Sequence, residues 1–202
     1  MFREMRRKRQ ALSPEENVAI LNRGTSGVLA VSGDDGYPYA VPLSYVYDGS
    51  KIYFHCAKSG HKLDAIKGNN KVSFCVIDQD HVVPERYTSY FRSVIVFGKI
   101  RVLDDDEEKR AAIEKLALKY APNDTVVNRQ KAIEREWNPL CMLEMTIDHM
   151  TGKKAIELVN EGKLDLTNSI SHTFPLTKAQ EAFDFVDSHD PSIRKIVLTF
   201  DF

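Results

Sequence analysis

Segments with the composition of β-strands recur along most of the chain, and tight turns join several of them. Gly33-Asp34-Asp35-Gly36 and Asp48-Gly49 are typical of the turns that connect antiparallel strands. Six segments have this strand-like character: 25–31, 39–47, 51–57, 71–77, 93–103 and 140–147. Six strands with few helices among them predict a mainly β fold, a small antiparallel barrel with flanking helices.

Helices are expected where capping residues precede an amphipathic segment. Ser13-Pro14-Glu15-Glu16 has the residues of a capping box and predicts a helix that ends near Gly24. Three further helices are expected: 59–67, the stretch after the acidic run 104–108, and 125–137. The polar stretch 78–90 contains Pro84 and is expected to be a loop.

The chain divides by composition into three parts. Residues 1–12 form a basic arm, 13–160 hold the predicted barrel, and 161–202 form an extension. The extension contains an apolar stripe at helical spacing, Leu176, Ala179, Phe183 and Val186, and ends in a predicted strand, 193–202. A mainly β domain with a C-terminal helix–strand appendage is therefore expected.

Composition excludes several classes of protein. The 28 Lys and Arg nearly balance the 29 Asp and Glu, which argues against a protein that binds nucleic acid over its whole surface. No apolar run approaches the roughly 20 residues that span a bilayer, and no apolar segment follows the basic arm as in a secretory signal. The three cysteines form no CxxC pair, so we expect reduced thiols in a cytoplasmic protein and no cysteine zinc site, and no motif supports another metal site.

Sequence motifs of the common catalytic folds are missing. The chain has no GxGxxG after its first strand, no phosphate-binding P-loop, no HExxH and no GxSxG. Its six histidines are scattered along the sequence. Any catalysis is therefore expected to depend on a bound organic cofactor.

Four segments, taken in order, carry a family resemblance. They are 36–45 (GYPYAVPLSY), 51–76 (KIYFHCAKSGHKLDAIKGNNKVSFCV), 90–98 (YFRSVIVFG) and 147–153 (IDHMTGK). Together they resemble the FMN-binding split-barrel superfamily, over roughly residues 12–158. More narrowly, they are similar to the branch related to pyridoxamine 5′-phosphate oxidase that holds the 5-nitroimidazole-resistance (Nim) reductases.

The resemblance implies a six-stranded antiparallel split barrel and a homodimer with FMN in two clefts at the subunit interface. By the same resemblance, the backbone of one strand lines the flavin ring, the next strand lies beside it, and a cationic junction binds the phosphate. The implied cofactor-binding residues are Val41, Pro42, Leu43, Ser44, Phe54, His55, Cys56, Ala57, His61, Lys62, Arg92 and Ser93. Relatives often have Arg-Lys where this chain has His61-Lys62, and Arg-Gln where it has Arg92-Ser93.

The residues themselves are consistent with this placement. In a strand over 51–57, Phe54 and Cys56 share one face and His55 lies on the other, so an apolar barrel interior directs His55 outward. The junction Lys58-Ser59-Gly60-His61-Lys62 combines cations with backbone N–H groups at a helix start, which is what a phosphate requires. A surface histidine and a solvated Lys58 are the alternatives.

The function implied by the resemblance is that of an FMN-dependent oxidoreductase. A nicotinamide nucleotide or another flavin system would supply electrons, and a nitroimidazole or other small acceptor would receive them. His55 is the candidate catalytic residue, which positions the acceptor or delivers protons. The alternatives are a pyridoxamine 5′-phosphate oxidase-like enzyme, a non-catalytic FMN-binding protein, a barrel that binds haem or a deazaflavin, and a nucleic-acid-binding regulator that uses Arg3–Arg9.

The extension has a separate resemblance. Residues 170–186 and 193–198 are similar to the C-terminal end of medium-chain zinc alcohol dehydrogenases, over roughly 162–201. That stretch carries neither the zinc ligands nor the Rossmann glycines of the family. It therefore implies a structural role, with the extension packed on the barrel or on a partner subunit.

Overall fold

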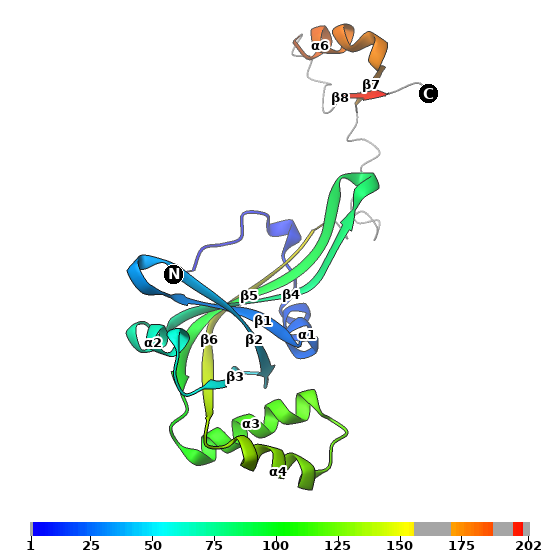
Figure 1. Cartoon of the computed structure of the whole chain (residues 1–202). Coiled ribbons are helices and arrows are strands. Elements are labelled where there is room, and N and C mark those ends of the chain that lie inside the picture. Colours follow the sequence, from blue (N-terminus) through cyan, green and yellow to red (C-terminus); the bar gives the residue numbers. More distant parts are fainter. Residues whose placement is uncertain (1, 156–170, 188–195, 200–202) are drawn as a thin grey trace. The chain divides into compact units, whose positions relative to one another are not determined.

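The computed structural model describes residues 2–155, 171–187 and 196–199 (Figure 1). The chain divides into two compact units, Met1–Ala155 and Ile156–Phe202. Each unit is described by itself.

The first unit is a closed barrel of six antiparallel strands. The strands are β1 (Ser26–Ser32), β2 (Pro38–Tyr47), β3 (Lys51–Ala57), β4 (Lys71–Val83), β5 (Thr88–Val102) and β6 (Leu140–Lys154). They pair in the order β1-β2-β3-β6-β5-β4 around the barrel. The mainly β, six-stranded antiparallel prediction is confirmed.

The prediction of a loop over 78–90 is wrong. β4 and β5 continue as a paired hairpin from Gln79↔Arg92 to Val83↔Thr88, after a register shift between Ile77 and Gln79. This hairpin extends away from the barrel (Figure 1), and it exposes apolar side chains such as Val82 and Tyr87 as well as polar ones. Pro84 begins the short 3-10 turn η3 (Pro84–Arg86) at the tip, where no ladder N–H is required.

The barrel interior is filled by aromatic and branched side chains. Tyr45, Phe54 and Phe74 are fully buried, and the ring of Phe74 meets each of the other two edge-on with centroids 5.0 Å apart. Full burial of each ring stabilises the fold by about 1.5–3 kcal/mol. The Tyr45 hydroxyl donates to the Leu21 carbonyl at 2.8 Å and so joins the barrel to the first helix.

The predicted capping box is confirmed in α1 (Pro14–Arg23). The Ser13 side chain accepts from the Glu16 N–H, and the Glu16 carboxylate accepts from the Ser13 N–H. The other predicted helices are α2 (His61–Gly68), α3 (Asp106–Tyr120) and α4 (Val126–Glu136). α3 covers part of β2 and β3 through a second apolar cluster that includes Val46, Tyr53 and Leu116.

The second unit contains a small parallel sheet and a helix. β7 (His172–Pro175) pairs in parallel with β8 (Ile196–Thr199), and η4 (Leu176–Lys178) and α6 (Ala179–Asp187) lie between them in the sequence. The expected helix is present, and the described part of the expected strand 193–202 is β8. β7 was not predicted.

The apolar stripe predicted in this unit does not form its buried face. Phe183 is 62% exposed and Val186 is 47% exposed. Ala182 is buried instead, and the ring of Phe185 contacts His172 with centroids 4.6 Å apart. The predicted docking of this unit on the barrel or a partner stays a prediction.

Candidate functional site

The ladder between β2 and β3 is short, so the two strands are paired over only part of their length. These two strands pair only at Tyr45↔Phe54, Val46↔Tyr53 and Tyr47↔Ile52. The first part of β2, residues 38–44, pairs with β1 instead. The last part of β3, residues 55–57, pairs with β6. The two strands therefore part, and each presents backbone along this split.

Predicted site residues lie on both sides of the split. On β2, Val41 and Leu43 are half-buried and pack against the core, whereas Pro42 is exposed on the outer face and Ser44 is half-buried. Pro42 has no N–H, and this edge position does not require one. Backbone groups of residues 41–44 can therefore contact a ligand at the split, as the family resemblance implies.

The end of β3 forms the opposite side. Phe54 is fully buried, so only its backbone can face a ligand at the split, and Cys56 is half-buried. His55 is exposed, as the predicted alternation requires, and so is Ala57. Tyr53 departs from that alternation: it lies on the outer face but is buried beneath α3, with the Lys115 ammonium 4.7 Å from its ring centroid.

The junction between β3 and α2 has an unusual backbone. Gly60 precedes α2 with φ 128° and ψ 165°, a conformation that favours glycine. No side chain caps this helix start, and the Gly60 carbonyl accepts from Leu63 N–H at 2.9 Å. A Cβ at Gly60 would meet nothing within 4 Å, so the space above the helix start is open.

Two lysines and a histidine surround this helix start. Lys58 and His61 are exposed and Lys62 is half-buried. Within the described part of the chain, no carboxylate lies within 4 Å of the Lys58 or Lys62 ammonium. His61 stacks on Tyr39 and its Nε2 atom lies 3.5 Å from an Asp34 carboxylate oxygen. The junction therefore offers two ammonium groups, one imidazole and the N–H groups of a helix start.

Arg92 and Ser93 lie elsewhere in the barrel. They pair with Lys154 and Lys153 of β6, whereas His55 pairs with Met142. Eleven residues of β6 separate Met142 from Lys153, which corresponds to about 36 Å along an extended strand. The Arg92 Nε atom is 3.1 Å from the Asp78 carboxylate. Arg92 and Ser93 are therefore far from His55 along β6.

Asp78 is a buried anchor for two arginines. Its carboxylate accepts from Arg23 at 2.5 and 2.6 Å, and its side chain is 7% exposed. The hydrogen bond from Arg23 is the main reason that the pKa of Asp78 is lowered, and burial opposes this effect. Arg92 is thus positioned at the base of the β4–β5 hairpin by an acid.

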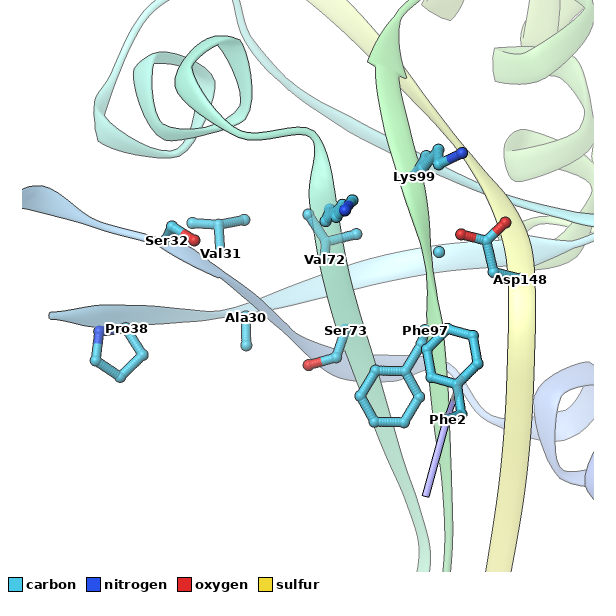
Figure 2. Close-up of a pocket in the computed structure, with 12 residues that line it drawn as sticks. Phe2, Ala30, Val31, Ser32, Pro38, Val72, Ser73, Phe97, Lys99 and Asp148 are labelled. Atoms are coloured by element: carbon cyan, nitrogen blue, oxygen red, sulfur yellow. The ribbon is translucent and has the colours of Figure 1, made fainter. Parts of the chain in front are cut away.

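A pocket of about 630 Å³ lies on the outer face of β1, β4 and β5 (Figure 2). Ser32 and Pro38 border one side, and the rings of Phe2 and Phe97 border another (Figure 2). The ring of Phe2 also stacks on His149 with centroids 4.8 Å apart.

The charged residues of this pocket were not among the predicted site residues. Lys71 and Lys99 line it together with Asp148. Lys71 and Lys99 are cross-strand partners in the β4–β5 ladder. The outward positions of the predicted strands 71–77 and 93–103 were the available signal for these lysines.

The described ranges contain neither a metal-binding cluster nor a membrane-spanning helix. No group of three or more His, Cys, Asp or Glu side chains is arranged to hold a metal ion there. No helix among those residues is both long enough and apolar enough to cross a membrane.

A six-stranded antiparallel barrel of this kind is the fold of split-barrel proteins. The family model described as pyridoxamine 5′-phosphate oxidase matches residues 13–154. The chain belongs to this family. A search of curated proteins finds no match.

Solved structures share the fold at low sequence identity. A candidate 5-nitroimidazole antibiotic resistance protein from Bacteroides thetaiotaomicron is 22% identical with a TM-score of 0.60, covering 71% of this chain and 86% of its own. An FAD-binding protein from Mesorhizobium loti is 24% identical with a TM-score of 0.54, covering 72% and 97%. The FAD and heme binding protein from Mycobacterium smegmatis is 20% identical with a TM-score of 0.60, covering 73% of each chain.

Proposed function

We propose that this protein is a flavin-binding oxidoreductase that uses FMN to reduce small electron acceptors of the nitroimidazole type. The observation that carries the proposal is the cationic junction at Lys58–Lys62, which lies beside the split between β2 and β3. Membership of the pyridoxamine 5′-phosphate oxidase family and structural likeness to proteins described as FAD-binding support a flavin.

The chemistry of the donor set fits a flavin phosphate. The phosphate of FMN is a dianion near neutral pH, and ammonium groups with helix N–H groups are its preferred partners. Lys62 and His61 would bind it at the start of α2, and Lys58 would add a second ammonium. The exposed backbone of residues 41–44 would orient the ring from the other side of the split.

His55 is the proposed proton-handling residue. It is exposed on β3, between the buried Phe54 and the half-buried Cys56. FMN, when bound, would supply two-electron transfer between a nicotinamide nucleotide, or another flavin system, and the acceptor. An imidazole nitrogen of His55 would hold the acceptor by a hydrogen bond and deliver the proton that reduction requires.

We also propose a homodimer with a flavin in each interface cleft. The outer sheet face exposes apolar side chains, with Val28 37%, Ile95 39% and Ile77 63% accessible. Val28 and Ile95 both pair with Cys75, so they lie on either side of it across β1, β4 and β5. A second copy on this face would cover them.

The first test is the absorbance spectrum of the purified protein, with the released chromophore identified by mass. Release of FMN supports the proposal, whereas release of FAD, haem or a deazaflavin contradicts the cofactor assignment. A colourless protein that does not bind added FMN contradicts the site assignment as well.

The second test separates the enzymatic alternatives. The reduced holoprotein is mixed anaerobically with a 5-nitroimidazole, and flavin reoxidation is followed by absorbance. Reoxidation faster than with oxygen supports nitroreduction. Turnover of pyridoxamine 5′-phosphate with oxygen would instead indicate the oxidase, and no steady-state turnover with any donor would indicate a non-catalytic FMN-binding protein.

A further inference from the structure

Two of the three cysteines face each other across adjacent strands. Cys56 of β3 and Cys141 of β6 are cross-strand partners in an antiparallel ladder. Partners in such a ladder point to the same face, with Cα atoms about 4.5–5.5 Å apart. Disulfides form when the Cα atoms are about 4.4–6.8 Å apart, so this pair needs no strand movement to be joined.

Both thiols lie largely out of solvent. Cys56 is half-buried and Cys141 is 6% exposed. Burial, and after it Cys141, raise the pKa of the Cys56 thiol to about 12, and the charge of Lys62 opposes the shift. Because little thiolate is present near neutral pH, exchange at this pair is expected to be slow.

The surroundings of the pair are cationic. A pocket of about 530 Å³ has Cys141 in its wall, and its charged residues are Lys58, Lys67, Lys109, Asp104 and Asp106. Lys109 is buried, and its ammonium donates to the Trp137 carbonyl at 3.2 Å. Three lysines against two aspartates give the lining of this pocket a small net positive charge, which is compatible with a small anionic partner.

We propose that Cys56 and Cys141 form a redox-active dithiol that is oxidised by small anionic disulfides of the glutathione disulfide type. The more exposed Cys56 sulfur, as thiolate, attacks one sulfur of glutathione disulfide and displaces one glutathione thiolate. Cys141, as thiolate, then attacks the Cys56 sulfur and displaces the second glutathione. Two protein thiols are oxidised to one disulfide, one glutathione disulfide is reduced to two thiols, and the two protons pass to the released thiolates.

The position of the dithiol gives this oxidation a structural consequence. Cys56 lies next to His55 and two residues before Lys58, at the end of β3 that borders the split. A disulfide would join this end covalently to the start of β6. The dithiol is defined without a flavin, so its test does not depend on the proposed function.

The test uses the full chain as purified, and its readout is the peptide map. The reduced protein is incubated for hours with reduced and oxidised glutathione at several ratios, free thiols are blocked with N-ethylmaleimide, and the digest is analysed by mass spectrometry. The expected product is a peptide pair joined through Cys56 and Cys141. Cys75, which has no cross-strand cysteine partner, is the internal control and is expected to give only a maleimide or glutathione adduct.

Two variants and a denatured sample complete the test. Cys75→Ser is expected to form the same linked peptides, and Cys141→Ser is expected to stop at a glutathione adduct on Cys56. Urea-unfolded protein is expected to lose the preference for this pairing. Separate adducts on Cys56 and Cys141 in the folded wild type, or no change in either thiol when most of the glutathione is oxidised, would overturn the proposal.

Discussion

The imidazole of His61 stacks on the ring of Tyr39, with centroids 4.3 Å apart and planes inclined by 26°. His61 is the first residue of α2, and Tyr39 lies near the start of β2. The contact therefore joins the helix start on one side of the split to the strand on the other side. It holds the proposed phosphate-binding segment against the backbone that would orient the flavin ring.

Replacing Lys62 by alanine is expected to weaken FMN binding. A hydrogen bond to a charged group contributes about 1.5–3 kcal/mol, so the dissociation constant should rise roughly tenfold to a hundredfold. The measurement is a titration of FMN with apoprotein, followed by quenching of FMN fluorescence. Lys67→Ala is the matched control, since Lys67 lies in the same helix and beside Asp64. Equal affinities of the two variants would contradict the phosphate assignment.

Replacing Ile95 by glutamate is expected to dissociate the proposed homodimer. Ile95 lies on the apolar outer face, and a charge buried there without a partner would cost several kcal/mol. Analytical ultracentrifugation of wild type and variant measures the change. Val127→Glu on α4 is the control, because Val127 is 59% exposed on another element. A monomeric wild-type protein, or a dimeric Ile95→Glu protein, would contradict the assignment of this face as the dimer interface.

The barrel could be predicted because its first hairpins have strong turn signals and its strands alternate regularly. The capping box at Ser13 and the outward direction of His55 follow from local rules of the same kind. Local rules failed for 78–90, because the residues of this hairpin do not alternate between polar and apolar as those of the barrel strands do. They also missed β7, whose pairing with β8 is a contact between distant residues.

The candidate site was predictable only as separate segments. The split itself depends on where the β2–β3 ladder stops, and no residue type marks that point. The distance between Ser93 and His55 depends on the register of β5 and β3 on β6. The outer pocket combines Phe2, β1, β4 and β5, and it exists only once the barrel has closed.

Adding a methyl group at Gly98 is expected to destabilise the barrel. A Cβ there would overlap the carbonyl oxygen of Thr146, beside the register shift between β5 and β6. Overpacking against backbone costs about 1–3 kcal/mol, so Gly98→Ala should lower the urea midpoint. Gly68→Ala is the control, because a Cβ at Gly68 meets nothing within 4 Å. A Gly98→Ala midpoint equal to that of the control would contradict this packing argument.

Removing the C-terminal unit is expected to leave the barrel intact. The six strands, α1 to α4 and both apolar clusters lie within residues 1–155. A chain of residues 1–155 should therefore unfold cooperatively and bind FMN with the affinity of the full chain. Thermal melts and the same FMN titration measure this. Loss of FMN binding in a folded fragment would show that the extension contributes to the site.

Glu144 is expected to make the stability of the barrel sensitive to acid. Its buried carboxylate accepts from Lys51 at 2.9 Å and from Arg101 at 2.9 Å. Burial alone would raise the pKa of Glu144, but the hydrogen bonds from Lys51 and Arg101 outweigh it and the pKa is lowered. The carboxylate therefore stabilises the fold above its unfolded pKa of 4.5, and this contribution is lost as the pH falls through the lower folded value.

Glu144→Gln tests this linkage, because the variant keeps the shape and lacks the titration. At pH 7 the variant should be about 1–3 kcal/mol less stable in urea, since it loses two charge-assisted hydrogen bonds. The difference from wild type should be constant down to about pH 5 and shrink below pH 4.5 as Glu144 protonates in the wild type. Glu107→Gln, at an exposed position in the first turn of α3, is the control. A difference for Glu144→Gln that persists unchanged at pH 3 would show that the ion pairs are not its cause.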